Sequence, residues 1–366
     1  MTDHLKRTPL FETHSLMNAK ILEFAGWDMP IQYSSILNET KSVRSNAGIF
    51  DVSHMGRVEI NGPDSVSLLN KLLSANIKNM TYGKGSYNLI CNESGGIIDD
   101  CIVYRIDEED FLLIPNASNT DIVLDWLYEW MSTSQKVHIK NVSSDYSMIA
   151  HQGPRAADML NNLTNTNITT MKPFTITSTE IIGVEILLAR TGYTGEDGFE
   201  LIIPNKHAPK VWTMLTDSGS LPCGLGARDV LRLEAGLLLH GNDMDASYNP
   251  YESCLDRFVD LSKQDYVAKD ALQDIKNKGV NRLLVGFTLQ ERRIPRPKCS
   301  ITVNGKNKIG TVTSGAFSPT LDTSIGLGYV HPRFSSEGST FMIDIRGNLV
   351  EATVTSLPFY SRRKNK

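Results

Sequence analysis

The stretch CNESGGIIDDCIVY, residues 91–104, sets two aspartates side by side within an otherwise apolar run. With the preceding SYNLICN it predicts a β-hairpin, because two strand-like runs flank the turn residues ESGG. Aspartate is depleted in strands and is rarely fully buried without a partner. The pair Asp99–Asp100 therefore needs an explanation in structure or in chemistry.

Strand alternation assigns the two aspartates to opposite faces, so they cannot share a role. A turn centred near residues 93–94 would pair Asp100 roughly opposite Tyr87 and place it between Tyr87 and Tyr104. A carboxylate in such a partly desolvated pocket can orient or deprotonate an amine-bearing ligand. In the alternative reading, one aspartate caps the glycine turn and the other is solvated.

The segments around this hairpin predict an α+β fold with several domains. Between residues 55 and 140 the order is strand, helix, three strands and helix, which is typical of an α+β unit. A second hairpin is expected over residues 184–204 and a long helix over residues 224–241. After residue 275, short strands alternate with turns, which predicts a small all-β barrel or sandwich.

The length and composition of the chain limit the kinds of protein that it can be. Its 366 residues exceed one ordinary core. Length therefore allows two or three domains. With the order of segments along the chain, we predict three, comprising residues 1–54 with 141–274, residues 55–140, and residues 275–366. A net charge of −4 gives no general attraction to nucleic acid or to anionic membranes. No run approaches 18 apolar residues, so no membrane span is expected.

Several motif classes are missing from the sequence. The five cysteines form no CxxC pair and no signal peptide is evident, which predicts reduced thiols and a cytoplasmic location. The eight histidines have no metal-ligand spacing, and no phosphate loop or GxSxG motif occurs. The GLG of residues 224–226 begins like a dinucleotide motif, but Asp229 replaces its third glycine. These absences predict a site of carboxylates, arginine and backbone groups, without metal or nucleotide.

A second group of candidate residues lies in RTGYTGEDGFEL, residues 190–201. Three glycines in seven residues indicate tight turns or close backbone approach. Glu200 begins the outgoing strand and points away from the face of Phe199 and Leu201. Its carboxylate can accept two N–H bonds from a pterin- or guanine-like heterocycle. The alternative is an ordinary hairpin with solvated acids.

A third group lies in the predicted helix after residue 224. Arg228 and Arg232 are four residues apart and share a face near the helix N-terminus. A cation there can bind a ligand carboxylate. In the alternative reading, Asp229 and Arg232 form an ordinary surface pair.

Together these stretches resemble the aminomethyltransferase (T-protein) family of the glycine cleavage system. The resemblance runs almost end to end and is carried by long, specific motifs. Besides the three stretches above, these motifs are TPLFETH, FAGWDMPIQY, GIFDVSHMGRVEI, HQGPRA, IGTVTSGAFSPTL and IGLGYV.

The resemblance implies a three-domain cloverleaf around a central channel that holds folate. It implies transfer of an aminomethyl group from the lipoyl arm of H-protein to tetrahydrofolate, with release of ammonia and formation of 5,10-methylenetetrahydrofolate. Tetrahydrofolate is then the co-substrate, lipoylated H-protein the partner, and no metal is needed. An acidic H-protein surface would meet basic residues around the channel mouth, for which the candidates are residues 292, 293, 296, 298 and 362–364.

The resemblance also assigns roles to individual residues. Asp100 corresponds to the key acidic residue near the pterin, Glu200 to a pterin contact and Arg228 to a folate contact. Further folate-lining residues implied by the motifs are Met55, Tyr87, Tyr104, Asn116 and Tyr193. We therefore expect Asp100, Glu200 and Arg228 to converge on one cavity.

Two other functions belong to proteins of this fold. One is a folate-dependent demethylase of a methylated small molecule, which would keep the folate motifs and change only the channel mouth. The other is a non-catalytic, folate-binding role in iron–sulfur cluster maintenance. Proteins of that kind carry a KGCYxGQE-like motif, whereas the corresponding QDYVAKDAL here has no cysteine.

Overall fold

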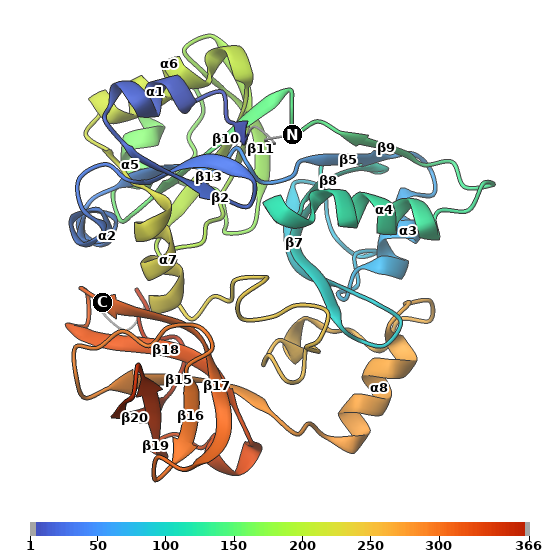
Figure 1. Cartoon of the computed structure of the whole chain (residues 1–366). Helices are drawn as coiled ribbons and strands as arrows, with labels where there is room; N and C mark the ends of the chain where they lie inside the picture. The colour runs from blue at the N-terminus through green and yellow to red at the C-terminus, as the bar shows by residue number, and fades with distance from the viewer. Residues whose placement is uncertain (1–4, 363–366) are drawn as a thin grey trace.

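Three lobes surround the centre of the molecule (Figure 1). The structure is a computed structural model and describes residues 5–362. The predicted α+β fold with an all-β C-terminal unit is confirmed.

The first lobe is built on a six-stranded sheet of order β11-β12-β13-β10-β4-β14. Its core contains Trp212, Phe199 and Leu201, all fully buried. A three-stranded sheet of order β1-β3-β2 lies in the same lobe. The strands are β1 (Lys6–Arg7), β2 (Lys20–Phe24), β3 (Trp27–Gln32), β4 (Gly48–Asp51), β10 (Tyr146–Gln152), β11 (Ile176–Ile181), β12 (Val184–Ala189), β13 (Gly198–Pro204) and β14 (Leu221–Pro222). The helices are α1 (Phe11–Leu16), α2 (Ile36–Ser45), α5 (Ala156–Asn161), η2 (Asn205–His207), α6 (Ala208–Asp217) and α7 (Leu225–Glu234).

The second lobe contains a five-stranded sheet of order β6-β7-β8-β5-β9. Leu68, Leu69 and Leu72 of α3 are buried in its core, as their helical spacing predicts. The strands are β5 (Val58–Asn61), β6 (Lys84–Cys91), β7 (Ile97–Arg105), β8 (Asp110–Ile114) and β9 (His138–Asn141), and the helices are α3 (Ser65–Leu72), η1 (Ala117–Asn119) and α4 (Thr120–Trp130). The sheet uses only residues 58–141, and the predicted domain boundaries at residues 54, 140 and 274 stay a prediction.

The third lobe is a closed barrel of order β15-β18-β17-β16-β19-β20. Side chains such as Phe287 and Ile343 fill its interior. Its strands are β15 (Leu283–Leu289), β16 (Ser300–Val303), β17 (Asn307–Ser318), β18 (Thr323–Val330), β19 (Thr340–Ile345) and β20 (Asn348–Thr355), with η4 (Pro332–Phe334) after β18. The chain reaches the barrel through η3 (Asp256–Phe258) and α8 (Lys269–Lys278), which packs against the β6–β7 hairpin.

The register of the β6–β7 hairpin differs from the prediction. Asp100 lies opposite Leu89, and Tyr87 lies opposite Ile102, so the turn centres between Ser94 and Gly95. Asn92 shapes this turn, because its Oδ1 accepts from the backbone N–H groups of Ser94 and Gly96. The predicted pairing of Asp100 with Tyr87 is therefore wrong by two residues, and a shift of two keeps both side chains on their predicted faces.

Helix α7 is shorter than predicted and ends at Glu234 rather than at residue 241. Gly236 adopts a φ of +66°, and its N–H bonds the carbonyl of Leu233, while Leu237 N bonds the carbonyl of Arg232. This pattern is a Schellman C-cap, which glycine adopts without strain. The predicted helical run therefore continues as a loop that turns toward the centre of the molecule.

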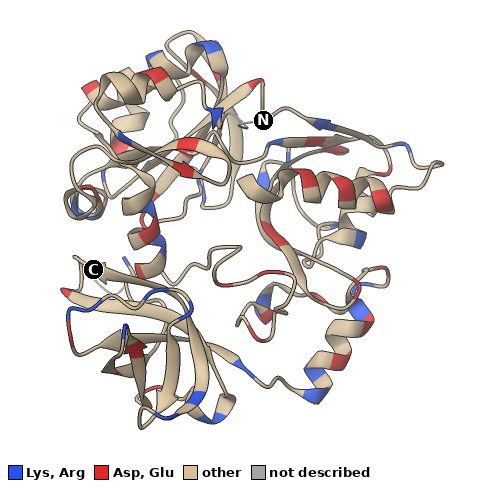
Figure 2. Cartoon of the chain, viewed as in Figure 1, with Lys and Arg blue, Asp and Glu red and all other residues tan. Residues whose placement is uncertain are grey.

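Charged residues of both signs are mixed over the three lobes (Figure 2). The exposed face of α4 is acidic, while α8 carries both signs. Among residues 5–362, no helix has the length and hydrophobicity needed to cross a membrane.

Candidate functional site

A cavity of about 820 Å³ lies between the first two lobes, α7 and the loop that follows α7. Such a volume is in the range of small-molecule sites. Asp100, Glu200 and Arg228 all line it, so the convergence expected from the sequence is observed. Within the part of the chain that the structure describes, no barrel strand contributes to the cavity wall.

The two adjacent aspartates have different environments. Asp99 is fully buried, and its carboxylate accepts hydrogen bonds from Asn116 N at 3.0 Å and from Asn119 Nδ2 at 3.0 Å. Asp100 opens on the cavity and accepts from Tyr87 OH at 3.0 Å. Asn116 Nδ2 donates to both carboxylates at 2.8 Å. Neither aspartate caps the turn, Asp99 is buried, and Asp100 is half-buried at the cavity wall, so that alternative reading is wrong.

Asp99 and Asp100 lie side by side without enough positive charge nearby to neutralise both carboxylates. Burial, together with the charge of Asp99, raises the pKa of Asp100 to about 6, although the hydrogen bonds from Tyr87 and Asn116 oppose the shift. Burial also raises the pKa of Asp99. Perturbed carboxylates in a cavity are characteristic of functional sites.

Glu200 reaches the cavity from β13 while its neighbours Phe199 and Leu201 lie in the core, as alternation predicts. Thr191 Oγ1 donates to Glu200 Oε2 at 2.6 Å, and Tyr104 OH lies 2.8 Å from Thr191 Oγ1. Because the Thr191 hydroxyl donates its only hydrogen to Glu200, Tyr104 is the donor in the bond between Tyr104 and Thr191. Burial raises the pKa of Glu200, although Thr191 and the charge of Arg228 oppose the shift.

Arg228 stacks on the ring of Tyr193, with Cζ 4.7 Å from the ring centroid. Its Nη1 is buried and makes none of the hydrogen bonds found among residues 5–362. Burial lowers the pKa of Arg228, against the charge of Glu200. A guanidinium with an unused donor next to a carboxylate is suited to a ligand with both donors and acceptors.

Comparison with known proteins identifies the family. The GCVT N-terminal domain matches residues 10–263, and the glycine cleavage T-protein C-terminal barrel domain matches residues 282–361. An aminomethyltransferase of Desulfitobacterium hafniense is 42% identical over 98% of this chain and 99% of its own length. One from Saccharopolyspora erythraea is 43% identical, with 98% of each chain covered. The crystal structure of glycine cleavage system aminomethyltransferase T from Bartonella henselae matches with a TM-score of 0.93 at 34% identity, covering 98% of this chain and 99% of its own.

The chain belongs to the glycine cleavage T-protein family. The resemblance found in the motifs is therefore confirmed, and with it the class of the protein, a transferase enzyme.

The other predicted folate-lining residues of this family member fall into two groups. Tyr87, Asn116, Met55 and Tyr193 line the cavity. Tyr104 does not, because it is 1% exposed and lies behind the wall, where it bonds Thr191. Its predicted place in the lining is corrected to a position behind Glu200.

The barrel supports the cavity without lining it. Arg232 lines the cavity yet is 1% exposed, and it forms an ion pair with Asp243 at 2.5 Å. Ser314 of β17 accepts from Arg232 and donates to Asp243, so the third lobe fixes this pair. Arg232 also forms the pair with Asp229 that the alternative reading predicts, in which Asp229 is half-exposed but Arg232 is buried.

Several lining residues were missed because their sequence context carries no signal. His54 and His240 have no metal-ligand spacing, and Phe258 ends the short helix η3, far along the chain. Phe258 packs edge-on against Tyr87 at 4.6 Å between ring centroids. The described residues contain no group of three or more His, Cys, Asp or Glu placed to hold a metal ion.

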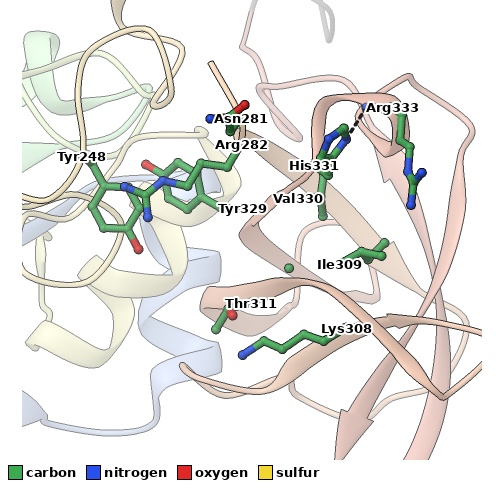
Figure 3. Close-up of a pocket in the computed structure, with 11 residues that line it drawn as sticks. Tyr248, Asn281, Arg282, Lys308, Ile309, Thr311, Tyr329, Val330, His331 and Arg333 are labelled. Carbon is green, nitrogen blue, oxygen red and sulfur yellow. Dashed lines mark hydrogen bonds between the residues drawn. The ribbon is translucent and has the colours of Figure 1, made fainter.

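A second, smaller cleft of about 400 Å³ lies at one end of the barrel (Figure 3). Its wall contains Lys308, His331, Arg333 and Arg282. Arg282 stacks on Tyr248 at 4.0 Å and pairs with Glu252. The charged side chains of this cleft are basic, whereas the cavity wall carries both carboxylates and arginines.

The basic residues expected around a channel mouth are partly neutralised. Arg292 pairs with Asp322 at 2.7 Å, and Arg293 pairs with Glu291 at 2.9 Å. Arg362 pairs with Asp197 at 3.3 Å. Residues 363 and 364 lie outside the described residues.

Proposed function

We propose that this chain is the tetrahydrofolate-dependent aminomethyltransferase of a glycine cleavage system. In that reaction the aminomethyl carbon leaves the lipoyl arm of H-protein, ammonia is released, and 5,10-methylenetetrahydrofolate forms. The observation that carries the proposal is the position of Asp100, a half-buried carboxylate that opens on the cavity between Tyr87 and Asn116.

The cavity suits the head of a reduced folate. Glu200 presents a carboxylate that can accept from the N–H groups of a pterin, and Thr191 fixes its orientation. Arg228 offers donors beside it, while Met55, Ile102 and other apolar side chains form much of the remaining wall. A few placed polar groups within apolar walls are the usual composition of such a site.

Asp100 would stabilise the positive charge that develops during the transfer. Attack on the methylene carbon requires a free lone pair on a folate amine, and the departure of ammonia develops positive charge. A fixed carboxylate stabilises that cation and can accept a proton from the attacking amine. Tyr87 and Asn116 hold the Asp100 carboxylate in place for this role.

H-protein is the partner that this reaction requires. We infer that an acidic face of lipoylated H-protein docks on basic side chains of the chain. Lys308 and Arg333 of the second cleft support this, since both are exposed and neither forms an ion pair with another described residue. A cytoplasmic location is supported by the five cysteines, all of which are free thiols.

The deciding experiment is an assay with lipoylated, aminomethyl-loaded H-protein and tetrahydrofolate. The wild type should form methylenetetrahydrofolate, and Asp100→Asn should lower kcat/KM by roughly 10²- to 10⁴-fold, the usual worth of an acid–base group. Asp110→Asn is a matched control, because Asp110 is an exposed aspartate of the same sheet and is not part of the cavity wall.

Two results would contradict the proposal. Full activity in Asp100→Asn would remove the carboxylate from the mechanism. A wild type that binds tetrahydrofolate but forms no product from H-protein would favour the folate-dependent demethylase, which would then be tested with methylated amines.

A further inference from the structure

His54 stands apart from the other polar side chains of the cavity. It lies in the segment after β4, next to Ser53, and lines the cavity beside Met55. Only 5% of its surface is exposed. Its ring packs edge-on against Phe24, with 5.7 Å between centroids and 84° between planes. Because so little of His54 is exposed, the surroundings of its ring are set mainly by the protein rather than by solvent.

His54 uses neither ring nitrogen in the hydrogen bonds found among residues 5–362. Nδ1 is sealed from solvent without a partner, whereas Nε2 is not sealed. His240, the other histidine of the cavity, differs, because Asn119 and the carbonyl of Ile97 meet its ring nitrogens. Nε2 of His54 is therefore an unused polar atom facing the cavity.

The position of the ring proton follows from the sealed nitrogen. Burial, with the charges of Arg228 and Arg57 acting against that of Asp51, lowers the pKa of His54 to about 4, so the ring is neutral near pH 7. A neutral ring carries one N–H and one lone pair. A buried N–H without an acceptor is rarer and more costly than a buried lone pair without a donor. The proton therefore belongs on Nε2, which faces the cavity.

We propose that His54 is a ligand contact that donates from Nε2–H to an acceptor atom, a carbonyl oxygen or an unprotonated ring nitrogen, of the molecule in the cavity. This inference rests on the proposed function, because that function makes the bound molecule a reduced pterin. Glu200 accepts from the ligand, and His54 donates to it. Together they select a heterocycle that carries N–H groups and acceptor atoms on different edges.

The test combines binding, stability and the tautomer itself. In wild type labelled with ¹⁵N-histidine, NMR should show His54 protonated on Nε2, and tetrahydrofolate should shift that resonance. His54→Phe keeps the ring packing and removes the donor, so tetrahydrofolate should bind about tenfold more weakly, the worth of one hydrogen bond. His54→Gln restores an N–H near the same place and should recover most of the affinity.

Thermal unfolding separates a ligand contact from a structural role. His54→Phe removes the sealed, unpartnered Nδ1, so the Tm of the unliganded protein should rise, whereas a structural histidine would lower it. His138→Phe, at an exposed histidine of β9, is the matched control for the substitution itself. A lower Tm in His54→Phe, a proton on Nδ1, or unchanged tetrahydrofolate affinity would each overturn the proposal. Failure of the wild type to bind tetrahydrofolate would instead overturn the proposed function, leaving the tautomer result to judge the donor assignment alone.

Discussion

Two carboxylates, the fully buried Asp51 and the half-buried Asp100, have pKa values shifted in opposite directions. Asp51 accepts from Thr8 Oγ1 at 2.6 Å, from His14 Nε2 at 2.9 Å and from Ser53 N at 2.9 Å. Burial alone would raise its pKa, but these partners lower it to about 2. Asp100 has two hydrogen-bond donors and a second carboxylate beside it, and its pKa rises to about 6.

The difference shows where the chain satisfies its buried charge and where it does not. Around Asp51 every carboxylate oxygen has a donor, and Tyr33 OH in turn lies 2.8 Å from His14 Nδ1, so the cluster joins the N-terminal segment to β4. Each oxygen of Asp100 also has a donor, but Asp99 adds a second negative charge beside it, so the pair Asp99–Asp100 lacks a balancing cation. A ligand that develops positive charge would supply it, which is the arrangement expected of a site that stabilises a transition state.

The largest predicted effect is on stability at Asp51. Asp51→Asn keeps one acceptor oxygen and turns an N–H group toward the donors on the other side, Thr8 and His14 or Ser53 N, so the free energy of unfolding should fall by about 3 to 5 kcal/mol. Urea unfolding at pH 7 measures the change. The Asp51 contribution is present above the unfolded-state pKa of an aspartate and is lost as the pH falls toward 2. A loss below about 1 kcal/mol would show that this cluster is not the stabilising counterpart of the cavity.

The next effect is on ligand affinity at Glu200, a buried carboxylate of the cavity. Glu200→Gln replaces one acceptor oxygen by a donor, so tetrahydrofolate should bind roughly 10- to 100-fold more weakly, as for hydrogen bonds to a charged group. Calorimetric titration measures this loss. Glu185→Gln is a matched control, because Glu185 is an exposed glutamate of the same sheet. Equal affinity in Glu200→Gln and wild type would remove Glu200 from the ligand contacts.

Asp100→Asn should change stability in the direction opposite to Asp51→Asn. Because the folded state binds the Asp100 proton more tightly than the unfolded state, the wild type loses stability as pH rises from about 4 to 6. The asparagine variant avoids this loss and should be about 1 to 2 kcal/mol more stable at pH 7.5, less than the full shift because Tyr87 and Asn116 lose a charged acceptor. At pH 4 the two proteins should unfold alike. A variant less stable than wild type at pH 7.5 would contradict the comparison.

Side-chain faces were predictable from the sequence, whereas partners across the fold were not. Alternation places Asp100 and Glu200 toward the cavity whatever the register, and this is why an error of two residues in the hairpin left Asp100 on its predicted face. The turn itself depends on Asn92 and on the bulge at Ile90 and Cys91, which the apolar pattern does not encode.

Contacts between distant segments explain the remaining differences. Tyr104 has the parity of a lining residue, but Thr191, 87 residues later, holds it behind Glu200. The capped end of α7 sends residues 236–242 along the cavity, where a continued helix would have carried them away. His54 acquires its unpaired nitrogen only from what packs around it.

The smallest predicted effect measures how much the negative charge of Asp99 contributes to the raised pKa of Asp100. Asp99→Asn removes the carboxylate beside Asp100 but leaves Tyr87, Asn116 and His240 around it, so the pKa of Asp100 should fall while staying above that of a solvated aspartate. The acid limb of kcat/KM, expected near pH 6 in the wild type, should move to lower pH. The variant will lose some stability, because its amide meets the donor Asn116 N, so the profile must be measured at temperatures where both proteins are folded. Because that loss alone would not move the limb, an unmoved limb would assign the raised pKa of Asp100 to burial alone and reduce Asp99 to a structural acceptor.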